Sequence, residues 1–262
     1  TNTLGWDLRL INVTSGDPRL VVCRDRLPYD LNTHNYNGSY WYGYADTDWP
    51  SGNSWGAGYD WAGYYYDAYG SSIYGRLLQM GMGNPLAPGT YYIGVRAPDG
   101  QTTPLSYTLL SRGIGTGFAI PLHPINYAGG SVSSNTLPVR EVAYYRIEVP
   151  SNAPSWKLRL NVTNEAMLAI QRGALPNVAC ANSAPTSMNG GRALQKLGDE
   201  EYLLLPMSGQ TNVVGGTYYL AVISEGQNPV SNRYGSNTCG FTLTSFGAAT
   251  TNQMGTLDAS GA

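Results

Sequence analysis

The sequence of 262 residues contains few charged side chains, since Asp, Glu, Lys and Arg make up 12% of it, against about 25% in a typical domain. This scarcity excludes coiled coils and long charged helices. The 13 Arg and 2 Lys are spread along the chain and the net charge is −2, which excludes nucleic acid as a partner. No run of about 18 apolar residues is present, so a membrane span is excluded. No basic segment followed by an apolar one opens the chain, which excludes an intact signal peptide. We expect Thr1 not to be the native start.

Cysteine and histidine are also scarce. The three cysteines, Cys23, Cys180 and Cys239, include no C-x-x-C pair, which excludes a thiolate zinc site. In an oxidising compartment Cys180 and Cys239 can form a disulfide or remain thiols. The two histidines, His34 and His123, lie in a turn-like stretch and between prolines, and no G-x-S-x-G, H-E-x-x-H, G-x-G-x-x-G or P-loop motif is present. We therefore expect no enzyme activity.

The chain repeats itself. Trp6-Asp7-Leu8-Arg9-Leu10 matches Trp156-Lys157-Leu158-Arg159-Leu160, and the match continues through Asn-Val-Thr with Ile11 as the only insertion. Four blocks recur in one order: 6–10 with 156–160, 24–28 with 172–176, 89–95 with 216–222, and 106–110 with 240–244. The repeat predicts two homologous domains, 1–112 and 113–249, followed by a tail or linker of small residues, 250–262.

The matched blocks alternate apolar and polar residues. Trp156, Leu158 and Leu160 fall on one face of an extended segment, with Lys157 and Arg159 on the other, as in a strand that covers a core. Glycines and prolines separate such segments. The pattern predicts an all-β fold with two tandem β-sandwich domains.

The order of these strands is similar to that of the bacterial pre-peptidase C-terminal domain. The resemblance rests on a Tyr-Tyr-Arg-Ile-Glu-Val-Pro strand at 144–150, the Trp-x-Leu-Arg-Leu strands, the following Leu-Pro, the Gly-Thr-Tyr-Tyr strands and a closing Phe-Thr-Leu-Thr strand at 241–244. It covers most of both halves and implies small β-sandwiches appended to secreted enzymes, located outside the cell or at the cell surface. It also implies substrate binding or surface retention and, often, a calcium site.

Calcium is accordingly a candidate cofactor, and no other cofactor is expected. Asp17 lies in Gly16-Asp17-Pro18-Arg19-Leu20, where the family's loop carries a second carboxylate in place of Arg19. A hard cation prefers six or more oxygen ligands. The remaining candidate ligands are Asp46, Asp48 and Asp60, which can instead form turns. Together with Asp67, they could also supply a carboxylate pair for glycoside hydrolysis.

The first domain begins abruptly. At least one strand is expected between Phe118 and Pro150 ahead of Trp156, whereas five residues precede Trp6. Either a preceding part of a longer protein has been cut away, or a strand from another chain or segment completes the first sandwich.

An aromatic segment, residues 36–74, distinguishes the first domain. It holds ten Tyr and four Trp, 14 of the chain's 30 aromatic residues, with seven Gly and no Lys, Arg or Glu. Rigid aromatic faces beside Asp and Asn are typical of sugar-binding surfaces and paratopes. The segment could instead contact a protein partner or pack internally. The candidate ligand-binding residues are Tyr40, Trp41, Tyr42, Trp49, Trp55, Tyr59, Trp61 and Tyr65.

Two functions follow from these patterns. The first is a non-catalytic extracellular module that binds a polysaccharide or another extracellular polymer through the aromatic segment. The alternative is a structural subunit of a filament or surface layer, which contacts neighbouring subunits through the aromatic segment and strand complementation.

Overall fold

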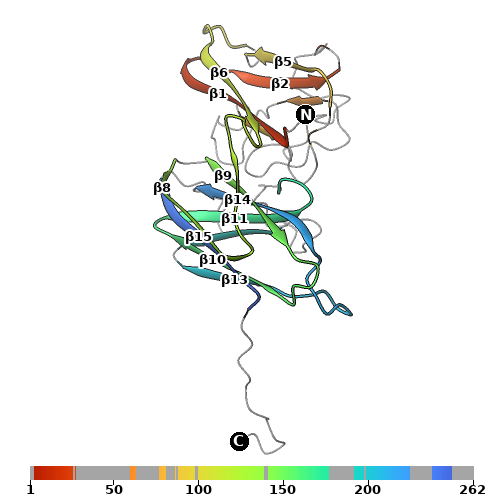
Figure 1. Ribbon diagram of the computed structural model, residues 1–262. Coiled ribbons are helices and arrows are strands. Elements are labelled where there is room, and N and C mark those ends of the chain that lie inside the picture. The colour runs from red at the N-terminus through yellow and green to blue at the C-terminus, as the bar shows by residue number, and fades with distance from the viewer. Residues whose placement is uncertain are drawn as a thin grey trace, which may run out of the picture.

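The computed structural model describes residues 3–25, 27, 60–62, 77–80, 86, 88–97, 100–138, 141–176, 192–197, 199–224 and 238–249 (Figure 1). The fold is all-β, as the alternation predicts, and no helix occurs in these residues. The strands are β1 (Gly5–Ser15), β2 (Arg19–Arg24), β3 (Asp60–Ala62), β4 (Leu77–Met80), β5 (Tyr91–Arg96), β6 (Ser106–Ile114), β7 (Leu122–Pro124), β8 (Ala128–Leu137), β9 (Val142–Val149), β10 (Trp156–Val162), β11 (Glu165–Arg172), β12 (Arg192–Leu197), β13 (Glu200–Leu204), β14 (Gly216–Ser224) and β15 (Cys239–Gly247).

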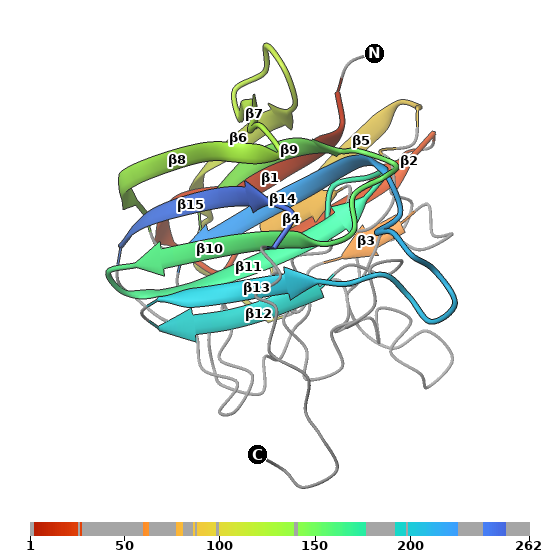
Figure 2. The same cartoon turned by 60° about the horizontal axis from the view of Figure 1, so that its bottom comes forward.

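The strands form four sheets. The first half of the chain, β1 to β6, gives the β1 sheet, with strand order β4-β1-β6, and the β2 sheet, with order β3-β2-β5. The second half, β7 to β15, gives the β10 sheet, β13-β10-β15-β8, and the β14 sheet, β12-β11-β14-β9-β7. Figure 2 shows β8 alongside β15 and β10 between β15 and β13. β6 runs to Ile114, two residues beyond the boundary predicted at 112.

Each half is a sandwich because its two sheets share a core. In the second half, Trp156, Leu158 and Leu160 of the β10 sheet pack with Leu168 and Leu220 of the β14 sheet, all fully buried. A fully buried leucine contributes about 1.5 to 3 kcal/mol through the hydrophobic effect. In the first half a smaller buried cluster joins the two sheets; it consists of Leu8, Leu10, Leu20 and Val22.

The same aromatic contact recurs in both sandwiches. The rings of Trp6 and Tyr91 meet edge to face at 5.3 Å, and Trp6 Nε1 donates to Ser111 Oγ at 2.8 Å. In the second half the centroid distance is also 5.3 Å and the indole hydrogen bond measures 2.9 Å, between the corresponding residues Trp156, Tyr218 and Ser245. Sequence alternation therefore places equivalent side chains in equivalent surroundings.

The extra residue of the first repeat, Ile11, is accommodated by an irregularity in β1. The register between β1 and β6 shifts between Ile11 and Ser15, and Asn12 has a positive φ of 51°. Between these pairs β1 has three residues where β6 has one, so the irregularity holds two additional residues and the side chains that follow keep their faces. Asn tolerates this conformation better than most residues.

The two halves pack against each other through the outer faces of the β1 and β14 sheets. An apolar cluster there joins Ile114 of β6 to the outer face of the β14 sheet, with Val142, Tyr144, Ala221 and Ile223 among its buried members. Burial raises the pKa of the Tyr144 phenol, and the charge of Asp7 raises it further. The β14 sheet is therefore covered on both faces, by the β10 sheet and by the first half.

Four charged side chains complete this contact between the halves. Asp7 of β1 is fully buried and lies 2.8 Å from Arg9 Nε, while Arg112 Nε of β6 donates to its carboxylate at 2.7 Å. Both guanidinium groups reach Glu141, which precedes β9, at 3.0 Å. Burial alone would lower the pKa of Arg112, but Asp7 and Glu141 raise it above its usual value.

Candidate functional site

The aromatic segment meets the described structure at one short strand. β3, residues Asp60–Ala62, lies within 36–74 and pairs antiparallel with β2 at the edge of the β2 sheet. Of the candidate ligand-binding residues, Trp61 belongs to β3. The others lie outside the described residues: Tyr40, Trp41, Tyr42, Trp49, Trp55, Tyr59 and Tyr65.

The pairing of β3 with β2 shows how the aromatic segment is attached to the β2 sheet. Asp60 is the pairing partner of Cys23, and Trp61 is the partner of Val22. Partners in an antiparallel ladder share a face, so position 61 is on the face of the sheet that carries buried Val22. Because Cys23 and Asp60 are partners, the connection between β2 and β3 leaves and rejoins the sheet at one point.

Connection lengths show which connections between strands contain the additional residues of the first half. Thirty-five residues join β2 to β3, whereas 19 join the corresponding strands β11 and β12. Fourteen residues join β3 to β4, against two between β12 and β13. The additional residues therefore belong to the two connections that flank β3 in the sequence.

The candidate calcium ligands are not brought together by the described structure. The backbone N–H of Asp17 donates to Gln101 Oε1 at 2.9 Å, in the turn between β1 and β2. Asp60 is placed only through its backbone in β3, and Asp46 and Asp48 lie outside the described residues. In the described part of the chain, no three side chains of His, Cys, Asp or Glu cluster as metal ligands would.

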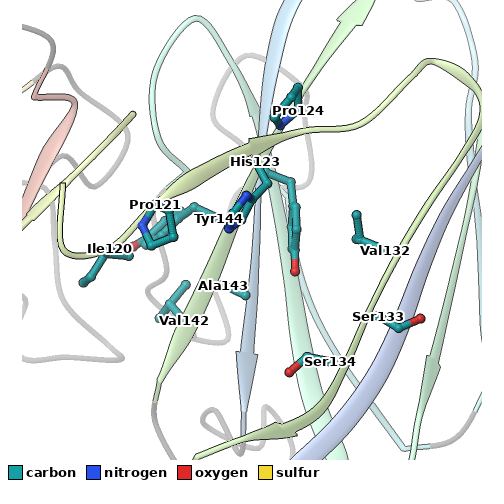
Figure 3. Close-up of a pocket in the computed structure, with 11 residues that line it drawn as sticks. Ile120, Pro121, His123, Pro124, Val132, Ser133, Ser134, Val142, Ala143 and Tyr144 are labelled. Atoms are coloured by element: carbon teal, nitrogen blue, oxygen red, sulfur yellow. The ribbon is translucent and has the colours of Figure 1, made fainter. Parts of the chain in front are cut away.

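A pocket that the sequence did not indicate lies in the second half, between β7, β8 and β9. It has a volume of about 590 Å³, and Figure 3 shows His123, Tyr144, Val132, Ser133 and Ser134 around it. The sequence indicates only an extended linker at Pro121–Pro124; in the structure β7 pairs parallel with β9 and brings His123 beside Tyr145, with ring centroids 6.3 Å apart. The remaining lining residues are Ile120, Pro121, Pro124, Val142 and Ala143.

The pocket offers an apolar wall with a few polar groups. Burial raises the pKa of Tyr145 to about 12, so its phenol keeps its proton at neutral pH. Ser133 Oγ is engaged with Thr242 Oγ1 at 2.9 Å. The lining includes no carboxylate, lysine or arginine, so its chemistry suits a small uncharged ligand. All the lining residues lie between Ile120 and Tyr145, but no sequence motif encodes the parallel pairing of β7 with β9 that brings them together.

A second surface that the sequence did not locate is the outer edge of β6. In the described residues β6 pairs with β1 on one side. On the other side, Ile120 makes backbone hydrogen bonds with Gly113, near the end of β6, and with Gly115, just beyond it. Leu109 pairs with buried Leu10 and so faces the core, yet it is 42% exposed, and Tyr107 on the same face is 38% exposed. Large side chains facing a core are normally covered, so in the described part of the chain this sandwich is open at β6.

Comparisons with known proteins add no family. No family model and no curated protein matches the chain. Among solved structures, one match is a copper-binding, surface-associated protein, CorA, of Methylomicrobium album BG8. It is 8% identical, with a TM-score of 0.24, and the match covers 47% of this chain and 97% of that one. The described part of this chain contains no helix of the length and hydropathy needed to cross a membrane.

Proposed function

We propose that this chain is a non-catalytic binding module of a larger secreted protein. In this proposal it acts outside the cell or at the cell surface and recognises a polysaccharide or a similar extracellular polymer. The two sandwiches form the scaffold, and the aromatic segment, residues 36–74, supplies the binding surface. This role agrees with what the resemblance to pre-peptidase C-terminal domains implies.

One contrast between the halves carries the proposal. The 35 residues that join β2 to β3 include nine Tyr and Trp, whereas the 19 residues that join β11 to β12 include no aromatic residue. Five Tyr lie in the 14 residues between β3 and β4. The second half forms its sheets and core without such rings, which supports a task other than folding for their concentration in the first half.

The chemistry of the segment suits an uncharged polymer. The flat face of a sugar ring carries C–H groups that pack on an aromatic face, while Asp and Asn accept hydrogen bonds from its hydroxyls. Tyr and Trp lose little conformational freedom when a ligand binds. The segment contains no Lys, Arg or Glu, so charge pairing is a small part of the expected recognition.

Binding of the intact chain to a glycan array and to insoluble polysaccharides tests the proposal. We expect saturable binding to at least one glycan, weakened about tenfold or more by Trp41→Ala or Trp55→Ala. Tyr107→Ala is the matched control, because Tyr107 is an exposed aromatic residue outside the segment, and it should leave the affinity unchanged. Failure of the intact chain to bind any glycan would contradict the proposal, as would full affinity in the Trp41→Ala, Trp55→Ala double variant.

The second candidate function is a structural subunit of a surface assembly. The open edge of β6 favours it, because exposed side chains that face a core are commonly covered by a partner. Sedimentation of the intact chain separates the two functions. Oligomers that dissociate on Trp41→Ala would favour assembly through the aromatic segment, whereas a monomer that binds glycans would exclude it.

A further inference from the structure

We propose that the outer edge of β6 is a docking site for an extended, uncharged polypeptide strand donated by a partner. The donated strand would run antiparallel to Ser106–Ser111 and place an aliphatic side chain against Leu109. This inference gives the assembly alternative a defined surface and does not depend on glycan binding, because it involves no residue of the aromatic segment.

The backbone of β6 presents hydrogen-bonding groups on this side. Ile120 donates its N–H to the carbonyl of Gly113 and accepts from the N–H of Gly115, both on the side away from β1. Peptide groups alternate along a strand, so the N–H and C=O groups of Tyr107, Leu109 and Ser111 point to the same side. No strand of the described structure pairs with them there.

The second half shows what the equivalent edge looks like when it is covered. Phe241 and Leu243 of β15 correspond to Tyr107 and Leu109 in the repeat, and they are 4% and 0% exposed. Strand β8 pairs with β15 and places Val132 opposite Leu243. The ring of Tyr145 from β9 meets that of Phe241 at 6.3 Å. In the described residues, the first half has neither strand.

The cover strand β8 also indicates the chemistry of the donor. Its outward side chains are hydroxyls that pair with those of β15, Ser133 with Thr242 at 2.9 Å and Ser131 with Thr244 at 3.0 Å. Thr108 occupies the position of Thr242 in β6 and is exposed. A fitting donor therefore carries Ser or Thr opposite Thr108 and a β-branched or aliphatic residue opposite Leu109.

The edge of β6 lacks the features that keep other strands away. Natural edge strands are protected by charged side chains, proline or bulges. Residues 106–111 are Ser-Tyr-Thr-Leu-Leu-Ser, with neither a charge nor a proline, and β6 is regular against β1 from Thr108 to Ile114. The next residue, Arg112, is paired with Asp7 and Glu141. An unprotected edge of this kind suits strand addition, in which the backbone gives affinity and alternate side chains give specificity.

The test uses the intact chain and a synthetic peptide with the sequence of residues 127–138, which contains β8. At saturating peptide we expect the amides of Tyr107, Leu109 and Ser111 to exchange with deuterium about tenfold more slowly. A peptide carrying Val132→Asp should have no effect. In the protein, Leu109→Asp should abolish the protection, whereas Leu203→Asp, at an exposed leucine of the edge strand β13, should preserve it.

Four results would overturn the proposal. The first is unchanged exchange at saturating peptide, and the second is equal protection by the Val132→Asp peptide. The third is protection retained in Leu109→Asp, a variant whose folding is checked by slow exchange of the buried Leu243 amide. The fourth is protection that appears without peptide and grows with protein concentration, because a second copy would then occupy the edge in place of a donated strand.

Discussion

The strands β1 and β10 have matching sequences but opposite surroundings on their outward faces. In β1, Asp7 is fully buried between the two halves and bonds to Arg9 and Arg112. In β10 the corresponding Lys157 has a side chain that is 32% exposed, and it pairs with Glu201 at 2.8 Å. The inward residues are the same in both strands because both cover a core. The outward residues differ because one sheet docks on the other half and the other faces solvent.

The largest expected effect follows from this contrast. Asp7→Asn should lower the free energy of unfolding by about 3 to 5 kcal/mol, because it removes a buried carboxylate from two guanidinium groups. Lys157→Met should change it by less than about 1 kcal/mol, since exposed ion pairs contribute little. Urea denaturation measures both, and similar losses in the two variants would contradict the buried network between the halves.

A second comparison concerns the open and covered edges. Leu243→Ala should cost about 2 to 5 kcal/mol of stability, because its side chain is fully buried. Leu109→Ala, at the matched position of the first half, should cost less than about 1 kcal/mol. Thermal unfolding of the two variants decides between these values. A cost for Leu109→Ala as large as that for Leu243→Ala would mean that β6 is covered in solution.

The smallest effect concerns the exposed charges around β10. Hydrogen bonds from Lys157 and Arg159 lower the pKa of Glu201 below its ordinary 4.5. The stability from these contacts is therefore present above that ordinary value and is lost as the pH falls through the lowered one. Glu201→Gln should be slightly less stable than the parent at about pH 6, and the difference should shrink as the pH falls below 4.5. A difference that grows on acidification would contradict this sign.

The local sequence pattern predicts those features that are set within a single strand, such as which of its residues face the core. Alternation places Trp156, Leu158 and Leu160 in the core, and the repeat identifies their counterparts. The insertion of Ile11 corresponds to the bulge in β1. By contrast, the contact between the halves includes Glu141, which pairs with Arg9 and Arg112 of the β1 sheet. No spacing in the sequence encodes that contact.

The candidate sites also divide into one that the sequence identifies and two that only the structure locates. Composition alone identifies the aromatic segment, and the structure adds that β3 anchors it at the edge of the β2 sheet. The pocket beside His123 requires β7 to lie against β9, and the exposure of Leu109 requires a cover strand to be missing. No motif encodes the pairing of β7 with β9. The sequence predicts that the first sandwich needs a further strand, but only the structure identifies β6 as the exposed edge.

The same sandwich occurs twice in the described residues, covered by β8 and β9 in the second half and open at β6 in the first. Amide hydrogen exchange of the intact chain tests this difference directly, by comparing Tyr107, Leu109 and Ser111 with their counterparts Phe241, Leu243 and Ser245. We expect the first set to exchange at least about a hundredfold faster, because its N–H groups face an unpaired edge. Equal protection of the two sets would contradict the account.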